Sequence, residues 1–433
     1  MILTLIFQVS AIHLSLPSQP ESTIVVVWTT PDSTPSFVQY GLTTGYGHQA
    51  EGRTFYSPSY GQYIHEVRIT DLSPDTLYHY RCGHPPKWSS DRTFLSGKPK
   101  GESGFSFVVY GDTRTDTTSR RRIRDVILSH LGQIRFILHC GDLVEVGSNR
   151  DLWEAFLIQM DTLFSRSPVM VTVGNHDEYG GLENYLDLFV LPEGSGTERF
   201  YSFTYGNLHI LSLYDPRPES RIKPTDPQYH WLTSDLEAAS NDPDIDWIIL
   251  FFHVPPYSAG YGYQYQREDI TPICDNFGID LVCSGHTHNY ERSYLLFKGE
   301  ITDSGPEYNG DLDGTVYIVT GGGGAPLSSA HYDWWTAYAK ECYHFLLIEV
   351  SESKLRVAVI GDSNQLIDSW SIKKSVAISG EKSLRRTRKV GKNSLFDPLG
   401  RRIEKRGPLP SGIYFLIIER DGKRHTEKLL ILH

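Results

Sequence analysis

The sequence predicts an α/β protein, with an all-β sandwich before its central region and a small β module after it. Three patterns lead to this fold class. Short β-branched strands separated by turn residues fill residues 10–96, apolar runs alternate with amphipathic stretches over 104–290, and strand patterns return over 314–372. The expected domains are residues 1–99, 104–372 and 394–433, with a polar, basic linker at 373–393.

The first region is expected to be a sandwich. "STIVVVWTT" is rich in the β-branched residues that favour strands. "LSPDTLYHYR" resembles the signature of fibronectin type III domains, which implies that Leu72 and Tyr78 lie in the core. "SGKPKGESG" is a candidate linker to the central region.

The central region predicts helices between buried strands. Residues 119–131 place an apolar stripe on one helical face, with Ser119 as the expected N-cap, and residues 151–164 repeat the spacing. Residues 226–240 begin with Asp then Pro, a favourable helix start. The strands of residues 314–372 are expected to form antiparallel hairpins that complete a second sheet.

Composition excludes several classes of protein. The 433 residues are 39% hydrophobic and 21% charged, and no apolar run approaches the roughly 18 residues of a membrane helix. The net charge of −11 disfavours general nucleic-acid binding, although residues 380–433 are basic and are either a solvated face or a polyanion site. Five cysteines without a CxxC pair support neither a disulfide framework nor a thiolate zinc site.

Five apolar runs end in polar residues that could form one site. A single such residue is usually a satisfied polar group or a helix cap, but five in order predict a common metal centre. Since ligands bind beyond the carboxyl ends of strands in open α/β sheets, these side chains should converge. Glycines 111, 141, 174 and 285 precede them and permit close backbone approach. The residues are Asp112, Asp142, Asn175, His176, His253, His286 and His288.

The residue types indicate which metals such a site would hold. Carboxylate and amide oxygens with imidazole nitrogens, and no thiolate, suit Zn²⁺, Mn²⁺ or Fe ions. One aspartate could bridge two cations, and two ions roughly 3.5–4 Å apart can clamp a phosphate and lower the pKa of a bound water. A rigid buried strand explains why Asp142 stands where the apolar run "FILHC" ends.

The motifs "GDTR", "GDLVE", "GNHD", "HVPPY" and "GHTHNYERS" resemble those of calcineurin-like metallophosphoesterases, most closely the purple acid phosphatases. The resemblance runs from about Ile12 to Ile372 and implies a four-layer α/β/β/α sandwich behind a fibronectin III-like domain. It implies one metal ion on Asp112, Asp142 and His288, and a second on Asp142, Asn175, His253 and His286. It also implies that His176 faces the substrate, to orient phosphate or to protonate the leaving group, and Asp177 is expected to set the tautomer of His176.

The sequence departs from the family pattern at the first ion. Glu145 stands where purple acid phosphatases have a tyrosinate ligand, and Arg114 stands where the wider superfamily has a histidine ligand. Glu145 could ligate directly, water could complete a weaker site, or the first ion is absent from the purified protein and Arg114 partly replaces its charge. Arg114 could also clamp the substrate phosphate or form a salt bridge to Asp116 or Glu145.

The resemblance implies a phosphomonoesterase that uses a metal-bound hydroxide at a dinuclear site. Arg114, Asn175 and Tyr263 are candidate phosphate-binding residues; Tyr263 lies near the place of paired family histidines. The alternatives are a phosphodiesterase or nucleotidase of the same superfamily, and a catalytically weakened surface binding protein.

The end of the chain suggests export. "DPLGRRI", "LPSGIYFL" and "KLLILH" resemble the C-terminal sorting domain of type IX secretion, which implies a secreted or cell-surface protein and the secretion machinery as a partner. The opening "MILTLIF" lacks the basic start and cleavage site of a full secretory signal.

Overall fold

The computed structural model describes residues 9–261 and 264–375, and beyond them the backbone of four strands. The chain divides into two units, Met1–Val376 and Ala377–His433. In the second unit, the four strands form an antiparallel sheet in the order β27, β26, β28, β29. Their bounds are β26 (Ser394–Phe396), β27 (Arg402–Ile403), β28 (Gly412–Arg420) and β29 (Lys423–Ile431). Among the described helices, none has the length and apolar character to cross a membrane.

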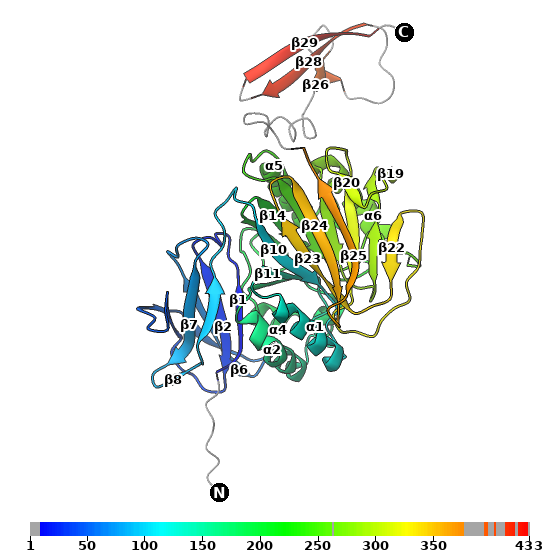
Figure 1. Ribbon diagram of the computed structural model, residues 1–433. Coiled ribbons are helices and arrows are strands. Elements are labelled where there is room, and N and C mark those ends of the chain that lie inside the picture. The colour runs from blue at the N-terminus through cyan, green and yellow to red at the C-terminus, as the bar shows by residue number, and fades with distance from the viewer. Residues whose placement is uncertain are drawn as a thin grey trace. The chain divides into compact units, whose positions relative to one another are not determined.

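The first unit begins with the expected sandwich (Figure 1). One sheet pairs β1 (Ser10–Ser15), β2 (Ile24–Thr30), β6 (Gln62–Ile69) and β5 (Arg53–Ser57) in that order. The other contains β4 (His48–Glu51), β3 (Phe37–Gly41), β7 (Leu77–His84), β8 (Lys87–Trp88) and β9 (Arg92–Leu95). Leu72 and Tyr78 are buried in its core, as predicted, and the Tyr78 hydroxyl accepts a hydrogen bond from the Ser73 N–H.

The sandwich packs directly against helix α2 (Arg150–Phe164). Asp161 of this helix accepts a hydrogen bond from the backbone N–H of Ile12, at 3.0 Å, and one from Arg92. The Tyr80 hydroxyl donates to the carbonyl of Ser165, where the helix ends. These contacts fix the sandwich on the central region.

The first central sheet mixes parallel and antiparallel strands. Its order is β12 (Val169–Val171), β11 (Ile134–His139), β10 (Phe105–Tyr110), β23 (His344–Val350), β24 (Lys354–Gly361), β25 (Leu366–Lys373) and β20 (Glu307–Asn309). β10, β11 and β12 run parallel, whereas β23 pairs antiparallel with β10. The prediction that the late hairpins complete a second sheet was therefore wrong for β23–β25. The parallel and the antiparallel strands all have continuous apolar runs, so hydrophobicity alone does not indicate which sheet a strand joins.

The second central sheet carries four parallel strands. Its order is β13 (Tyr201–Tyr205), β14 (Leu208–Ser212), β15 (Trp247–Phe252), β16 (Leu281–Ser284), β21 (Val316–Thr320), β17 (Tyr290–Ser293) and β22 (Thr336–Lys340). β14, β15, β16 and β21 are parallel neighbours. A separate hairpin pairs β18 (Leu295–Phe297) with β19 (Glu300–Asp303).

Alternation along β15 shows how the layers stack. Ile248, Leu250 and Phe252 pack with α5 (Pro227–Ser240) and α6 (Gln264–Phe277). Ile249 and Phe251 belong instead to the cluster shared with the first sheet, α1 (Thr117–Ser129) and α2. Side chains of a strand point alternately to opposite faces, so the second sheet is covered by helices on one side and by a sheet on the other. This is the predicted four-layer α/β/β/α sandwich.

The helices follow their sequence signals with one correction. Asp226 precedes Pro227 at the start of α5, as expected. At α1 the N-cap is Asp116 rather than Ser119, because the Asp116 carboxylate accepts from the backbone N–H groups of Thr118 and Ser119. Two short helices, α3 (Asn175–Glu178) and α4 (Glu183–Leu188), follow β12.

Candidate metal centre

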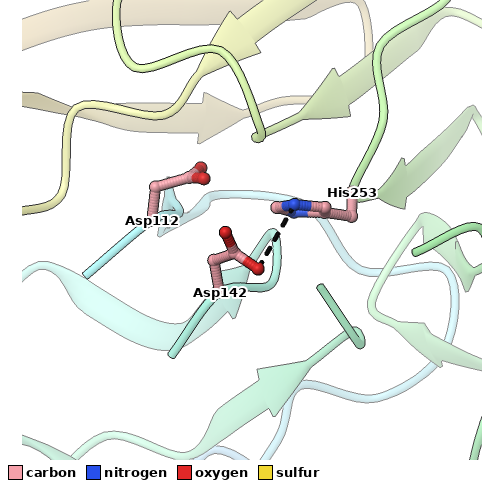
Figure 2. A group of neighbouring side chains, drawn as sticks. All are labelled: Asp112, Asp142 and His253. Atoms are coloured by element: carbon pink, nitrogen blue, oxygen red, sulfur yellow. Dashed lines mark ion pairs between the residues drawn. The ribbon is translucent and has the colours of Figure 1, made fainter. Parts of the chain in front are cut away.

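The ends of five parallel strands bring the predicted residues together. Asp112 follows β10, Asp142 follows β11, Asn175 begins α3 after β12, His253 follows β15, and His286 follows β16. Figure 2 shows Asp112, Asp142 and His253 pointing toward one another, and candidate ligand atoms of these three buried residues all lie within 4.8 Å of one another. The carboxyl ends of the parallel strands in the two sheets therefore supply the two sides of the centre.

The backbone at these strand ends is strained. Asp112, Asp142 and His286 have φ angles of 59°, 55° and 67°, the left-handed region that residues other than glycine seldom adopt. Such conformations persist only where the surroundings impose them, and they concentrate at functional sites. Other described residues, such as Tyr46 and Lys298, also have positive φ angles, so the strain supports the assignment only together with the residue types and their convergence.

Glycines 174 and 285 leave room for the two carboxylates. A Cβ at Gly174 would lie 2.2 Å from Asp142 Oδ1, and a Cβ at Gly285 would lie 2.3 Å from Asp112 Oδ2. Any side chain at either position would collide with a candidate ligand. The backbone at these two glycines therefore approaches the carboxylates closely, as their positions before the polar residues predicted.

Four atoms form a compact set that suits one cation. Asn175 Oδ1 lies 2.9 Å from His286 Nδ1 and 3.1 Å from His253 Nε2, and the two ring nitrogens are 3.1 Å apart. His253 Nε2 lies 3.4 Å from Asp142 Oδ1. With metal–ligand distances of about 2.1 Å, neighbouring ligand atoms lie about 3.0–3.4 Å apart, so this oxygen and nitrogen set fits a Zn²⁺-sized ion.

Backbone carbonyls orient two of the imidazoles. His253 Nδ1 lies 2.8 Å from the Cys140 carbonyl, and His288 Nδ1 lies 2.7 Å from the Pro326 carbonyl. A carbonyl only accepts, so each Nδ1 carries the proton and each Nε2 keeps its lone pair for the centre. For His286, burial and then the neighbouring His253 lower the pKa to about 3, which keeps that ring neutral as a ligand.

The residues implied for the first ion lie beside this set. His288 Nε2 is 3.5 Å from Asp112 Oδ1. The Arg114 guanidinium lies among them, with Nε donating to Asp142 Oδ2 at 3.1 Å and Nη2 3.4 Å from His288 Nε2. Nη1 donates to Glu145 Oε2 at 2.6 Å, so the expected salt bridge of Arg114 is to Glu145 rather than Asp116. Thr115 also donates to Glu145.

His176 lies at the edge of the centre. Its backbone N–H donates to Asp142 Oδ1 at 2.9 Å, and its Nδ1 lies 2.8 Å from the Glu145 carbonyl. The ring is about one quarter exposed, with a side-chain exposure of 26%. The Glu145 carbonyl therefore sets the tautomer of this histidine.

Asp177 has a different role from the one expected. Its buried carboxylate accepts hydrogen bonds from four backbone N–H groups, those of Asp142, Leu143, Val144 and Gly174. It holds the β11 and β12 loops together, and the expectation that it orients the His176 ring was wrong. The sequence could not reveal this, because the four donors are backbone groups.

The glycine loop after β21 contributes contacts that the sequence did not predict. The N–H of Ala325 donates to the Asp112 carbonyl at 2.8 Å, and Pro326 supplies the carbonyl for His288. A Cβ at Gly321 would lie 2.9 Å from Asp112 Oδ2. The segment "TGGGGAPL" was the available signal. Tyr263, the remaining candidate, lies outside the described residues.

Comparison with known proteins defines the class first. Residues 105–290 match the calcineurin-like phosphoesterase family, and residues 9–96 match the purple acid phosphatase N-terminal domain. The chain has the fold of a purple acid phosphatase from yellow lupin (Lupinus luteus) seeds, with a TM-score of 0.76 over 87% of this chain and 76% of that one, at 21% identity. Fold and site thus define a metallophosphoesterase.

Curated relatives then give the family. Purple acid phosphatase 15 of Arabidopsis thaliana is 31% identical over 389 residues, covering 73% of this chain and 68% of the relative. Purple acid phosphatase 21 of the same plant is 31% identical over 348 residues, covering 73% and 72%. Acid phosphatase type 7 of Homo sapiens is 26% identical over 81% of this chain and 87% of the relative. The chain belongs to the purple acid phosphatase family and is a metal-dependent phosphoric ester hydrolase, as predicted.

Proposed function

We propose that the chain hydrolyses phosphate monoesters at a centre held by Asp112, Asp142, Asn175, His253, His286 and His288. The observation that carries the proposal is the set of four ligand atoms of Asp142, Asn175, His253 and His286, with spacings of 2.9–3.4 Å. When bound, the ions would lower the pKa of a coordinated water and neutralise charge on the phosphate. The donor set favours Zn²⁺, Mn²⁺ or Fe.

His176 is proposed as the residue that meets the substrate beside the ions. Its Nδ1 is held by the Glu145 carbonyl, which leaves Nε2 for a phosphate oxygen or the leaving alkoxide. Imidazole suits both tasks, because its ordinary pKa lies near neutrality. Proton transfer and phosphate binding can be separated by the leaving group. A His176→Gln variant should lose more activity on alkyl phosphates, which need protonation, than on para-nitrophenyl phosphate.

Asn175 can serve both the ion and the substrate. Its Oδ1 faces the two ring nitrogens, which leaves the amide N–H groups to donate to a phosphate oxygen. Arg114 is the other candidate, because its planar fork matches phosphate geometry. Both roles use donors of side chains that contact the centre.

Turnover with defined metals tests the function. The chelator-treated chain would be loaded with Mn²⁺, Zn²⁺ or Fe and assayed with para-nitrophenyl phosphate and its bis ester. We expect faster turnover of the monoester with at least one metal and none without metal. Preference for the bis ester would favour the phosphodiesterase alternative, and no turnover with any metal would favour the surface binding protein.

The second unit is proposed to direct export of the protein. The β pattern of residues 394–433 and the motifs that resemble a type IX sorting domain support a secreted or cell-surface protein. Removing residues 394–433 should leave phosphatase activity intact and block export in a host with that machinery. Loss of catalytic folding on deletion would instead assign these residues a structural role.

A further inference from the structure

Arg114 lies where an incoming ion at the first position would find its ligands. It bonds Asp142 Oδ2 at 3.1 Å and lies 3.4 Å from His288 Nε2, so it contacts two of the three residues implied for that ion. Its side chain is 15% exposed. The four-atom set of the second position has no such cation among its members, and its spacings already match those of a bound metal.

The guanidinium opposes a second cation in two ways. It cannot give up its proton and has no acceptor, so it keeps its positive charge and cannot become a ligand. It also occupies the Asp142 oxygen that would face the first ion, while Asp142 Oδ1 faces His253 and the His176 N–H. An ion entering there must displace the guanidinium or bind beside a fixed charge.

Glu145 gives Arg114 a partner outside this position. The 2.6 Å contact to Glu145 Oε2, supported by Thr115, involves Nη1 and is separate from the contacts to Asp142 and His288. The guanidinium can thus withdraw from Asp142 and remain paired. The same contacts occupy Glu145 Oε2, so Oε1, 3.5 Å from His176 Nδ1, is the oxygen left to replace the family tyrosinate as a ligand.

We propose that Arg114 makes the two metal positions unequal: the position of Asn175, His253 and His286 binds its ion tightly, and the position of Asp112 and His288 fills only when Arg114 withdraws. This rests on the proposed metal centre and adds an internal competitor to it. The enzyme would lose its first ion readily on dilution and regain it at higher metal concentration.

Metal binding to one variant that removes the charge of Arg114 and one that keeps it tests this proposal without an activity assay. Apo wild type, Arg114→Gln and Arg114→Lys would be titrated calorimetrically with Mn²⁺ and with Zn²⁺, and bound Mn²⁺ followed by electron paramagnetic resonance, which distinguishes a single ion from a coupled pair. Wild type should bind one ion at least about tenfold more tightly than the other. The neutral glutamine should tighten the weaker step at least about tenfold, and lysine, which keeps the charge, should leave it weak.

The controls and outcomes are distinct. Arg122→Gln removes a half-exposed arginine of α1, paired with Asp362, and should leave both steps unchanged. Circular dichroism confirms folding of each variant. Two equal steps in the wild type, an unchanged weak step in Arg114→Gln, or equal tightening in Arg114→Lys would each overturn the inference while the metal centre stands. If neither the wild type nor any of the variants bound metal, the proposed function would be overturned as well.

Discussion

His253 Nε2 and His286 Nδ1 lie 3.1 Å apart, and both face the same oxygen of Asn175. His253 Nδ1–H donates a hydrogen bond to the Cys140 carbonyl, so His253 Nε2 has a lone pair. An amide oxygen and two ring nitrogens at these distances can all present lone pairs to a single cation. This relationship is the reason to expect Asn175 to matter as much as either histidine.

Replacing Asn175 by alanine should remove the tightly held ion. The amide oxygen is the atom common to both histidine contacts, so its loss opens the set. We expect a drop in kcat/KM of at least about 100-fold and less than one tightly bound ion per chain, measured by mass spectrometry after gel filtration. Asn241→Ala, at the C-cap of α5, should retain metal and activity. Equal metal content in the two variants would contradict the assignment.

Gly174→Ala should disturb the same centre by steric overlap alone. The residue has φ −99° and ψ 170°, which alanine adopts without strain, but its Cβ would lie 2.2 Å from Asp142 Oδ1. Moving that carboxylate or the loop should cost about 1–3 kcal/mol of stability and most of the activity. Gly132→Ala meets no atom within 4 Å and should be nearly neutral. Urea unfolding and phosphatase assays of both variants give the comparison.

Asp177→Ala should destabilise the fold rather than only slow the reaction. Four backbone N–H groups would lose their acceptor in a fully buried place, which should lower the free energy of unfolding by about 3 kcal/mol or more. Asp151→Ala, at a largely exposed side chain of α2, should change it by less than about 0.5 kcal/mol. A stable Asp177→Ala protein with a reduced kcat would contradict this structural role of Asp177.

The sequence was sufficient to predict where the central strands end, because the end of an apolar run is a local feature of the sequence. Apolar runs that stop at Asp142 or His253 identify strands and candidate ligands together, and parallel pairing within each sheet places such strand ends on the same side of that sheet. The pairing of β23 with β10 could not be predicted in this way. It depends on which apolar strand finds which edge, and that is decided by packing over more than 200 residues.

Contacts made by backbone groups were also invisible in the sequence. Asp177 and Pro326 act through peptide N–H and carbonyl groups, which every residue possesses. Arg114 is the opposite case, because an arginine at this motif position is visible in the sequence itself. The sequence thus showed that Arg114 departs from the family pattern. Its role followed only from its contacts with Asp142 and Glu145.

The iron-loaded protein should be colourless. In the family, purple colour comes from charge transfer between tyrosinate and iron, and this chain has Glu145 at the tyrosinate position, bonded to Arg114 and Thr115. A carboxylate offers no comparable visible transition. Absorption spectra of the chain loaded with Fe under oxidising conditions should show no visible charge-transfer band, and such a band would require a tyrosine from elsewhere at the centre.

The N-terminal sandwich should lose stability on acidification through His65. This residue is buried, stacks on Trp28 at 4.9 Å, and hydrogen-bonds Thr30 and Ser36 at 2.7 and 2.9 Å. Burial, and then the neighbouring His84, lower its pKa to about 4. The unfolded chain, with a pKa of about 6.5, therefore binds more protons than the folded one between these values. The stability contribution is complete above about pH 6.5 and falls as the pH drops toward 4.

A variant that cannot titrate isolates this effect. In His65→Gln, the side chain can still hydrogen-bond the two hydroxyls but carries no proton equilibrium. Free energies of unfolding in urea at pH 7.5 and 4.5 should fall by on the order of 2 kcal/mol more in the wild type than in the variant. Because every other titrating group is common to both proteins, the difference between the two falls reports His65. Equal falls would mean that protonated His65 is accommodated in the folded sandwich.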